Sequence, residues 1–185
     1  MMRNPFTRAD DGSIVWAAQV FEVGLLTSLA EQLVTIIDAP VWSDDPLERW
    51  SNEQAASELD RDDPVIERLF PSAYEDTDDA AEYRRLMEAE QRSAKSADAQ
   101  VVLAALGEAD ARLPLVRIEP GTEQAWLRCS NAMRLALGAR LGIETEEDSE
   151  ALDELDEDDP RSQVADVYQW LMYVQTCLLD CLTGD

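Results

Sequence analysis

Histidine is absent from this sequence of 185 residues, lysine occurs once and cysteine three times. The chain therefore lacks the side chain that most often serves as a general base and as a zinc ligand. Its acids are too numerous for any two to be singled out as a catalytic pair, and it contains no glycine-rich phosphate loop or cluster of metal ligands. We therefore predict no catalytic residues, no metal site and no cofactor, because no nucleophile has a base to activate it.

Long hydrophobic runs are also missing. The first residues contain no apolar run of the kind that a secretory signal has, and no later segment approaches 18 uninterrupted apolar residues. We expect a cytoplasmic protein that does not associate with membranes. Its length and its 45% of hydrophobic residues favour a single domain, residues 1–185, with a core of its own. In a reducing cytoplasm the three cysteines should be free thiols, so any disulfide would be regulated.

Positive charge is scarce, since 40 acids face 15 bases and the net charge is −25. This charge opposes tight binding to nucleic-acid phosphates and favours a basic partner. The distribution is uneven, however, because residues 79–140 contain nine bases and nine acids. Any surface that contacts DNA should lie within that interval.

Two short segments are predicted to be strands. Residues 12–21 are compatible with a strand, and residues 115–119 alternate apolar and polar side chains before Pro120 and Gly121. We expect the two segments to pair.

Helical spacing dominates the rest of the chain. It predicts helices over residues 22–37, 64–70, 78–106, 122–141 and from 161 to about 182. Asp63 and Thr77 are expected N-caps, Gly142 is an expected helix terminator, and Ser51 could begin a further short helix. On the longest helix we expect the buried face to contain Tyr83, Met87, Ala94, Ala97 and Val101. The fold class is therefore mainly α, a single helical domain with a small two-stranded β ladder near the N-terminus.

The segment 144–159 holds eleven acids and no base. Repulsion between these charges predicts a solvated, flexible acidic loop. A second interpretation is a binding segment for a basic surface, in which Leu152 and Leu155 anchor a short helix that forms on binding.

The most specific chemical feature is the pair Cys177 and Cys181, which are spaced one helical turn apart. Two thiols so placed can exchange between a dithiol and a disulfide, and closing the bond would deform the last turn of the helix. The alternative is that both are small apolar residues that pack the helix, as free cysteines usually do. The helix C-terminus and Asp180 disfavour a thiolate, and Cys129 is predicted to lie in the core.

A cluster of bases lies on the long helix, namely Arg84, Arg85, Arg92 and Lys95. Three of them, at positions 84, 92 and 95, could form a basic stripe that contacts phosphate or an acidic partner. The alternative is pairing with acids such as Glu88 one turn away. Farther along, Arg134 is expected to pair with buried acids, while Asn131 is expected to bind backbone carbonyls.

Two stretches of the sequence carry a family resemblance. The first is DPVIERLFPSAYEDTDDAAEYRRL and the second is WLRCSNAMRLALGARLGI; the matching positions are Asp63, Pro64, Arg68, Leu69, Pro71, Tyr74, Glu82, Tyr83, Arg84, Trp126, Leu127, Asn131, Arg134, Leu135, Gly138, Arg140, Leu141 and Gly142. Together with residues 22–37 and the terminal helix they resemble the actinobacterial oxidative-stress transcription regulators of the AosR family, long known only as a domain of unknown function.

The resemblance implies a redox-responsive transcription regulator. In that family a Cys-x3-Cys pair forms an intramolecular disulfide under oxidative stress, and this promotes association with a sigma factor or another transcription-complex protein. Only Cys177 and Cys181 match that pair here. DNA would then be contacted weakly or through the partner. The alternative function is an acidic adaptor that does not sense oxidants and whose cysteines are structural. The oligomeric state stays open, with a homodimer as one option.

Overall fold

A small antiparallel sheet lies at one end of the molecule. The computed structural model describes residues 4–37, 63–71, 78–110, 113–156 and 158–184. The strands are β1 (Phe6–Arg8), β2 (Ile14–Ala17) and β3 (Leu115–Ile118), in the order β1-β2-β3. β2 and β3 pair as predicted, with Ile14 opposite Ile118. The expectation of two strands was wrong because β1 adds a third, and its three residues are too few to show a strand pattern.

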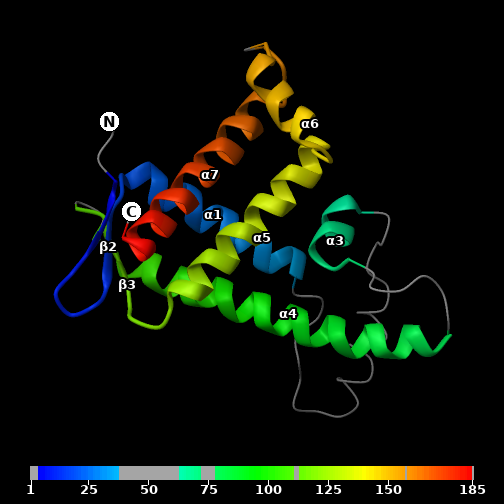
Figure 1. Cartoon of the computed structure of the whole chain (residues 1–185), viewed down its shortest axis with the longest axis horizontal. Coiled ribbons are helices and arrows are strands. Elements are labelled where there is room, and N and C mark those ends of the chain that lie inside the picture. The colour runs from blue at the N-terminus through cyan, green and yellow to red at the C-terminus, as the bar shows by residue number, and fades with distance from the viewer. Residues whose placement is uncertain (1–3, 38–62, 72–77, 111–112, 157, 185) are drawn as a thin grey trace.

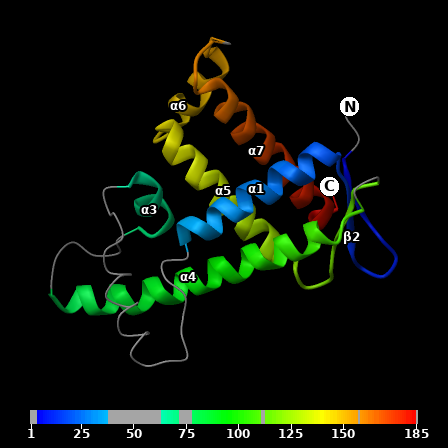
Figure 2. The ribbon, with the colours of Figure 1, turned by 180° about the vertical axis from the view of Figure 1, so that it is seen from behind.

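Helices make up most of the described chain, which confirms the mainly α class. They are α1 (Val20–Ile37), α3 (Pro64–Leu69), α4 (Asp78–Gly107), α5 (Glu123–Leu141), α6 (Glu146–Glu150) and α7 (Ser162–Thr183), with a 3-10 turn η1 (Ala151–Glu154). In Figure 1, α5 and α7 run side by side and are joined at the top by α6, and α4 runs below them. Figure 2, the view from behind, shows α1 in front of α5 and α7 and crossing them.

The core fills the space between the sheet and the helices. Trp16 and Ile118 point inward from the sheet and join Leu26 of α1, Trp126 of α5 and Leu171 of α7, all almost fully buried. A smaller apolar cluster joins the end of α5 to η1 and the start of α7 and consists of Leu141, Leu152, Ala165 and Tyr168. Burial of these side chains is the main free-energy gain that fixes the helices relative to one another.

Helix α1 is long and apolar enough, by length and composition alone, to cross a membrane. It nevertheless buries Leu26, Ala30, Leu33 and Ile37 in the core and packs against α4 and α5. The core helix of a folded domain can meet the same two criteria, but only 22% of this helix is buried, so burial accounts for part of its apolar character.

Several helix boundaries follow from the predicted caps. The side chain of Asp63 accepts a hydrogen bond from the Val65 amide and begins α3, with Pro64 in the first turn. Gly142 ends α5 in the left-handed region, at φ 73°. Helix α1 begins two residues before its predicted start, because the carboxylate of Glu22 accepts a hydrogen bond from the Gln19 amide and completes the first turn.

The predicted buried face of α4 was wrong. Ala94 and Ala97 are exposed, and the residues that face the core are Arg92, Asp98, Ala99, Val102 and Leu106. The sequence pattern did not identify the buried face, because alanines occur on every side of this helix and two of its buried residues are charged. Both charged residues are ion-paired, which lowers the cost of burying them.

The acidic segment 144–159 is more structured than a loop. Thr145 and Asp148 form a capping box that begins α6, and η1 follows directly. Leu152 is buried, and Leu155 packs against the same small cluster. The two leucines therefore anchor the segment to its own chain. The short helix predicted at Ser51 and the cap predicted at Thr77 lie outside the described residues.

Candidate functional site

The predicted thiol pair lies on the last two turns of α7. Cys177 is 7% exposed and belongs to the main core, beside Leu178 and Val174, whereas Cys181 is half-buried at the edge of that core. Both thiols are free. The periodicity of α7 therefore puts them on one stripe, with Cys181 nearer to solvent.

The end of α7 is tied to the N-terminal segment of the chain. The side-chain amide of Asn4 donates to the carbonyl oxygen of Cys177 at 2.8 Å, and its carbonyl oxygen accepts from the Phe6 amide at 2.8 Å. Asn4 thus links the thiol turn directly to the first residue of β1. Figure 1 shows the two chain ends near each other at the sheet. A change in the backbone at Cys177 would therefore alter the hydrogen bonds that hold β1 in place.

A second set of contacts links α7 to the start of α1. The indole N–H of Trp170 donates to the Glu22 carboxylate at 3.1 Å. One turn later, the neighbouring Cys177 thiol, together with burial and the Glu22 charge, raises the pKa of the Tyr173 phenol. The environment of Cys177 is therefore polar on one side and apolar on the other.

The charges that adjoin the pair along α7 are negative. Residues 171–184 contain no lysine or arginine, Asp180 is adjacent to Cys181, and the helix C-terminus carries partial negative charge. Both thiols should therefore react slowly with peroxide compared with cysteines that have a cationic neighbour.

Cys129 occupies the core, as predicted. It is 1% exposed on α5, and burial, reinforced by the nearby Asp98 carboxylate, raises the pKa of its thiol to about 12. A thiol in that state is unreactive at neutral pH.

The basic residues of α4 have separate environments. Arg92 is buried: its guanidinium binds Glu88 at 2.6 Å, reaches the Ile37 carbonyl and lies over the Phe70 ring at 5.0 Å. Lys95 lies over the same ring, at 5.8 Å. The predicted basic stripe is therefore broken at Arg92, whose charge holds α1, α3 and α4 together.

Arg84 and Arg85 lie in the first turns of α4, and their side chains are outside the described residues. Figures 1 and 2 show this end of α4 projecting beyond the other described helices. A role for these two residues in contacting a partner or nucleic acid stays a prediction.

The arginines of α5 also differ from expectation. Arg134 donates to the Asn131 side chain at 2.9 Å, so Asn131 meets an arginine and not a backbone carbonyl, and among the described residues no acid lies within ion-pair distance of Arg134. Arg140 pairs with Asp63 at 2.9 Å and so holds the cap of α3 against α5.

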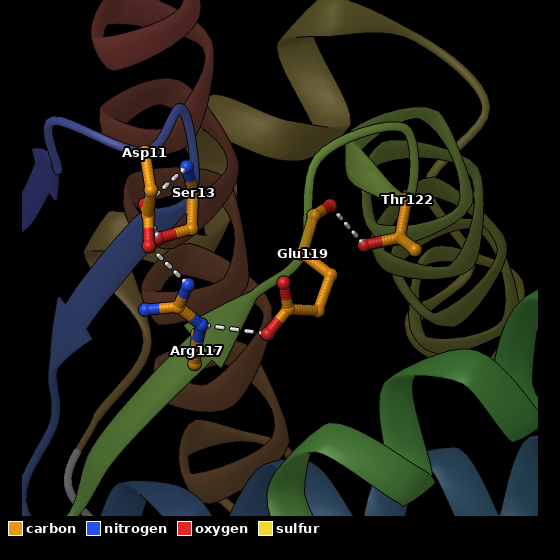
Figure 3. A network of polar contacts seen from close by, with 5 residues as sticks. All are labelled: Asp11, Ser13, Arg117, Glu119 and Thr122. Carbon is orange, nitrogen blue, oxygen red and sulfur yellow. Dashed lines mark hydrogen bonds and ion pairs between the residues drawn. The ribbon is translucent and has the colours of Figure 1, made fainter.

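A polar network that sequence reasoning missed crosses the sheet (Figure 3). Arg117 on β3 binds Asp11 in the β1–β2 turn and also Glu119. The same Asp11 carboxylate accepts from the amide and hydroxyl of Ser13. Arg117, with help from Ser13, holds the pKa of Asp11 well below its usual range. The one sequence signal for this network was a charged residue, Arg117, in an otherwise apolar strand. The sequence could not show which acid it binds, because Asp11 is 106 residues away.

A shallow pocket of about 160 Å³ lies where α3, α5 and α7 meet. Its lining includes the side chains of Arg68, Arg134 and Tyr168. Sequence reasoning did not find it, because its parts come from residues 68 to 168. Among the residues that the structure describes, no three potential metal ligands cluster.

Comparison with known proteins covers nearly the whole chain. The model of a domain of unknown function, DUF2017, matches residues 2–182. A protein of Mycobacterium leprae (strain TN) named for the oxidative stress regulator AosR is 33% identical over 174 residues, which are 85% of this chain and 77% of that protein.

The oxidative stress regulators AosR of Mycobacterium bovis and of Mycobacterium tuberculosis (strain H37Rv) are each 30% identical over 179 residues, which are 88% of this chain and 79% of theirs. No solved structure matches. With this extent of agreement, and with the two stretches quoted above falling inside the matched region, the chain belongs to the DUF2017 family.

Proposed function

We propose that this protein is a cytoplasmic regulator of the oxidative stress response whose switch is the pair Cys177 and Cys181. The names of its relatives support the regulator role. The observation that carries the switch is the position of the pair: two free thiols one turn apart at the end of α7, on a turn that is hydrogen-bonded to the N-terminal strand.

The chemistry begins at Cys181, because this thiol is nearer to solvent. Its thiolate attacks hydrogen peroxide, the O–O bond breaks, and a sulfenic acid and hydroxide form; the hydroxide takes up the proton that the thiol released and becomes the first water. The Cys177 thiolate then attacks that sulfur, the S–S bond forms, and hydroxide leaves and is protonated to the second water. In total, two thiols lose two electrons and two protons to one peroxide.

Closing this bond must change the backbone. Cβ atoms one helical turn apart are separated by about 5–6 Å, whereas a disulfide needs roughly 3.5–4.5 Å. The last turn of α7 therefore has to tighten or unwind. Because the Cys177 carbonyl accepts the Asn4 amide, the deformation should break that bond and release β1 from α7.

The released end of the sheet and α7 would then bind a sigma factor or another transcription-complex protein. A basic partner suits a chain of net charge −25. DNA would be contacted through that partner, because the chain itself repels phosphate.

The test is oxidation of the purified protein with peroxide or diamide, followed by disulfide mapping and hydrogen exchange. We expect a Cys177–Cys181 bond that a reductant reverses, with faster amide exchange in residues 4–8 and 178–184. Binding to a stress-responsive sigma factor should strengthen on oxidation. Cys177→Ser should abolish all three changes, whereas Cys129→Ser, a matched loss of one thiol, should leave them intact.

A second function, the acidic adaptor, is favoured by the unreactive environment of the thiols. In that case oxidation would leave both the exchange pattern and the affinity for a basic partner unchanged. A pair that stays reduced under excess diamide, or that closes without any effect on binding, would establish the adaptor and refute the switch.

A further inference from the structure

The pocket between α3, α5 and α7 differs from the rest of the surface in its charge. Eight arginine side chains are described: Arg8, Arg68, Arg92, Arg117, Arg128, Arg134, Arg140 and Arg161. Five of them bind a carboxylate at 2.5 to 2.9 Å, namely Arg92, Arg117, Arg128, Arg140 and Arg161. In a chain with 40 acids, pairing is the ordinary state of an arginine.

Three depart from that state: Arg8 on β1, and Arg68 and Arg134, which both line the pocket. Within the described part of the chain, neither of the two pocket arginines has an acid at ion-pair distance. Arg68 donates to the carbonyl oxygen of Ile143, and Arg134 donates to the side-chain oxygen of Asn131. Each guanidinium has five N–H donors, so most of its hydrogen-bonding capacity is left over.

One of these donors is buried without a partner. The Nε atom of Arg134 is out of contact with solvent, and no described group accepts its hydrogen bond. A buried donor in this state costs free energy, which a rotation of the Arg134 side chain that turns Nε toward an acceptor in the pocket would recover. A charged acceptor recovers most, because hydrogen bonds between guanidinium and an oxyanion are both charge-assisted and bidentate.

The remaining walls give the pocket its shape. Tyr168 is mostly buried and forms one side, and Gly138 leaves the space that a larger side chain would fill, since a Cβ there would lie 3.6 Å from the Tyr168 ring. The volume of about 160 Å³ is roughly ten times what a single water requires. The pocket therefore has room for a small molecule but not for a nucleotide.

We propose that this pocket binds a small oxyanion, a carboxylate or phosphate group held by Arg134 and Arg68. The ligand would bridge α3 and α5, and so would stabilise the fold at a place remote from the thiol turn, independently of the redox switch. Arg68, Arg134 and Gly138 also belong to the two stretches that carry the family resemblance.

Glu144 lines the same pocket, and its exposed carboxylate gives the proposal a sharp test. If an anion binds between the arginines, this like charge must weaken it. Glu144→Gln should then tighten binding, whereas loss of either arginine should loosen it. A gain in affinity cannot result from a damaged fold.

The experiment is a titration of the full chain with inorganic phosphate and, separately, with acetate, at ionic strength matched with sodium chloride. The readouts are the Nε–H resonances of the arginines and the unfolding temperature. We expect a saturable shift of the Arg134 Nε–H signal and a higher unfolding temperature with at least one of the two anions. Whichever anion saturates identifies the ligand as a phosphate or a carboxylate.

Arg134→Gln and Arg68→Gln should each weaken binding roughly tenfold, the size of one charge-assisted hydrogen bond. Arg161→Gln is the matched control, because it removes the same charge from an exposed site outside the pocket and should leave the affinity unchanged. The proposal is overturned if neither anion gives a saturable shift, or if Arg161→Gln weakens binding as much as Arg134→Gln. It is also overturned if Glu144→Gln leaves the affinity unchanged.

Discussion

At the scale of single residues, the three cysteines of this chain show how position decides reactivity. All three have the same intrinsic chemistry, yet Cys129 is sealed in the core, Cys177 faces the core from the last turns of α7, and Cys181 is half-buried at its edge. Access to an oxidant therefore increases in that order. Only Cys129 has a cationic neighbour in the sequence, Arg128, and the charge of that arginine is paired with Asp98.

We predict that alkylation will follow the same order. With iodoacetamide at about pH 8, Cys181 should be modified first and Cys177 more slowly, while Cys129 should react only when the protein unfolds, because the thiolate is the reactive form. Peptide mass spectrometry over a time course measures all three rates in one sample. If Cys129 in the native protein is labelled as fast as Cys181, the core assignment is wrong.

The raised pKa of Cys129 has a consequence for stability. Folding keeps this thiol neutral, so its contribution to the free energy of unfolding is complete below the ordinary pKa of 9.0 and is lost as the pH rises toward about 12. Alkaline unfolding should therefore expose Cys129 to iodoacetamide in step with the loss of helical circular dichroism.

At the scale of helices and strands, the sequence predicted correctly those boundaries and pairings that depend on residues close together in the chain. The Asp63 cap, the Gly142 terminator and the pairing of β2 with β3 follow from side-chain chemistry within a few residues or from strand patterns. The buried face of α4 did not follow, because it depends on Arg92 meeting Glu88, Phe70 and the end of α1.

Helix α6 is an element that the sequence analysis did not predict. The count of acidic residues predicted a solvated loop, but the capping side chains Thr145 and Asp148 outweigh the repulsion between those acids. The Thr145 hydroxyl accepts the Asp148 amide, and the Asp148 carboxylate accepts the Thr145 amide in return. The amide of Glu144 donates to the same carboxylate, and this bond together with those from Thr145 lowers the pKa of Asp148. Thr145 therefore specifies a helix in a composition that disfavours one. The oxyanion pocket was beyond prediction, because only the fold brings α3, α5 and α7 together.

We predict that Thr145→Ala will unfold α6 locally. Loss of an N-cap costs about 1 kcal/mol, which corresponds to roughly fivefold faster amide exchange in residues 146–150. The control is Thr122→Ala, since Thr122 begins α5 without a side-chain cap and should leave exchange in that helix unchanged. Equal exchange rates in the parent and Thr145→Ala proteins would show that Leu152, and not the cap, holds this segment.

At the scale of the whole molecule, the charge of −25 is the dominant property. The neutral interval 79–140 folds into α4, β3 and most of α5, so the surface without excess negative charge is concentrated on these elements. The projecting end of α4, with Arg84 and Arg85, is the part of that surface farthest from the sheet and from the thiols (Figure 1).

We predict that the protein alone will not retain duplex DNA in a mobility-shift experiment at about 0.15 M salt, a concentration at which phosphate contacts are already strongly weakened. Any retention at low salt should disappear in the Arg84→Glu/Arg85→Glu variant, because it reverses the charge of two adjacent bases that the sequence offers for phosphate contact. The matched control is Glu82→Gln/Glu90→Gln, which makes the same helix less acidic and should not weaken retention. Retention at about 0.15 M salt that survives the arginine changes would mean that the chain recognises DNA directly at another surface, which would contradict the prediction.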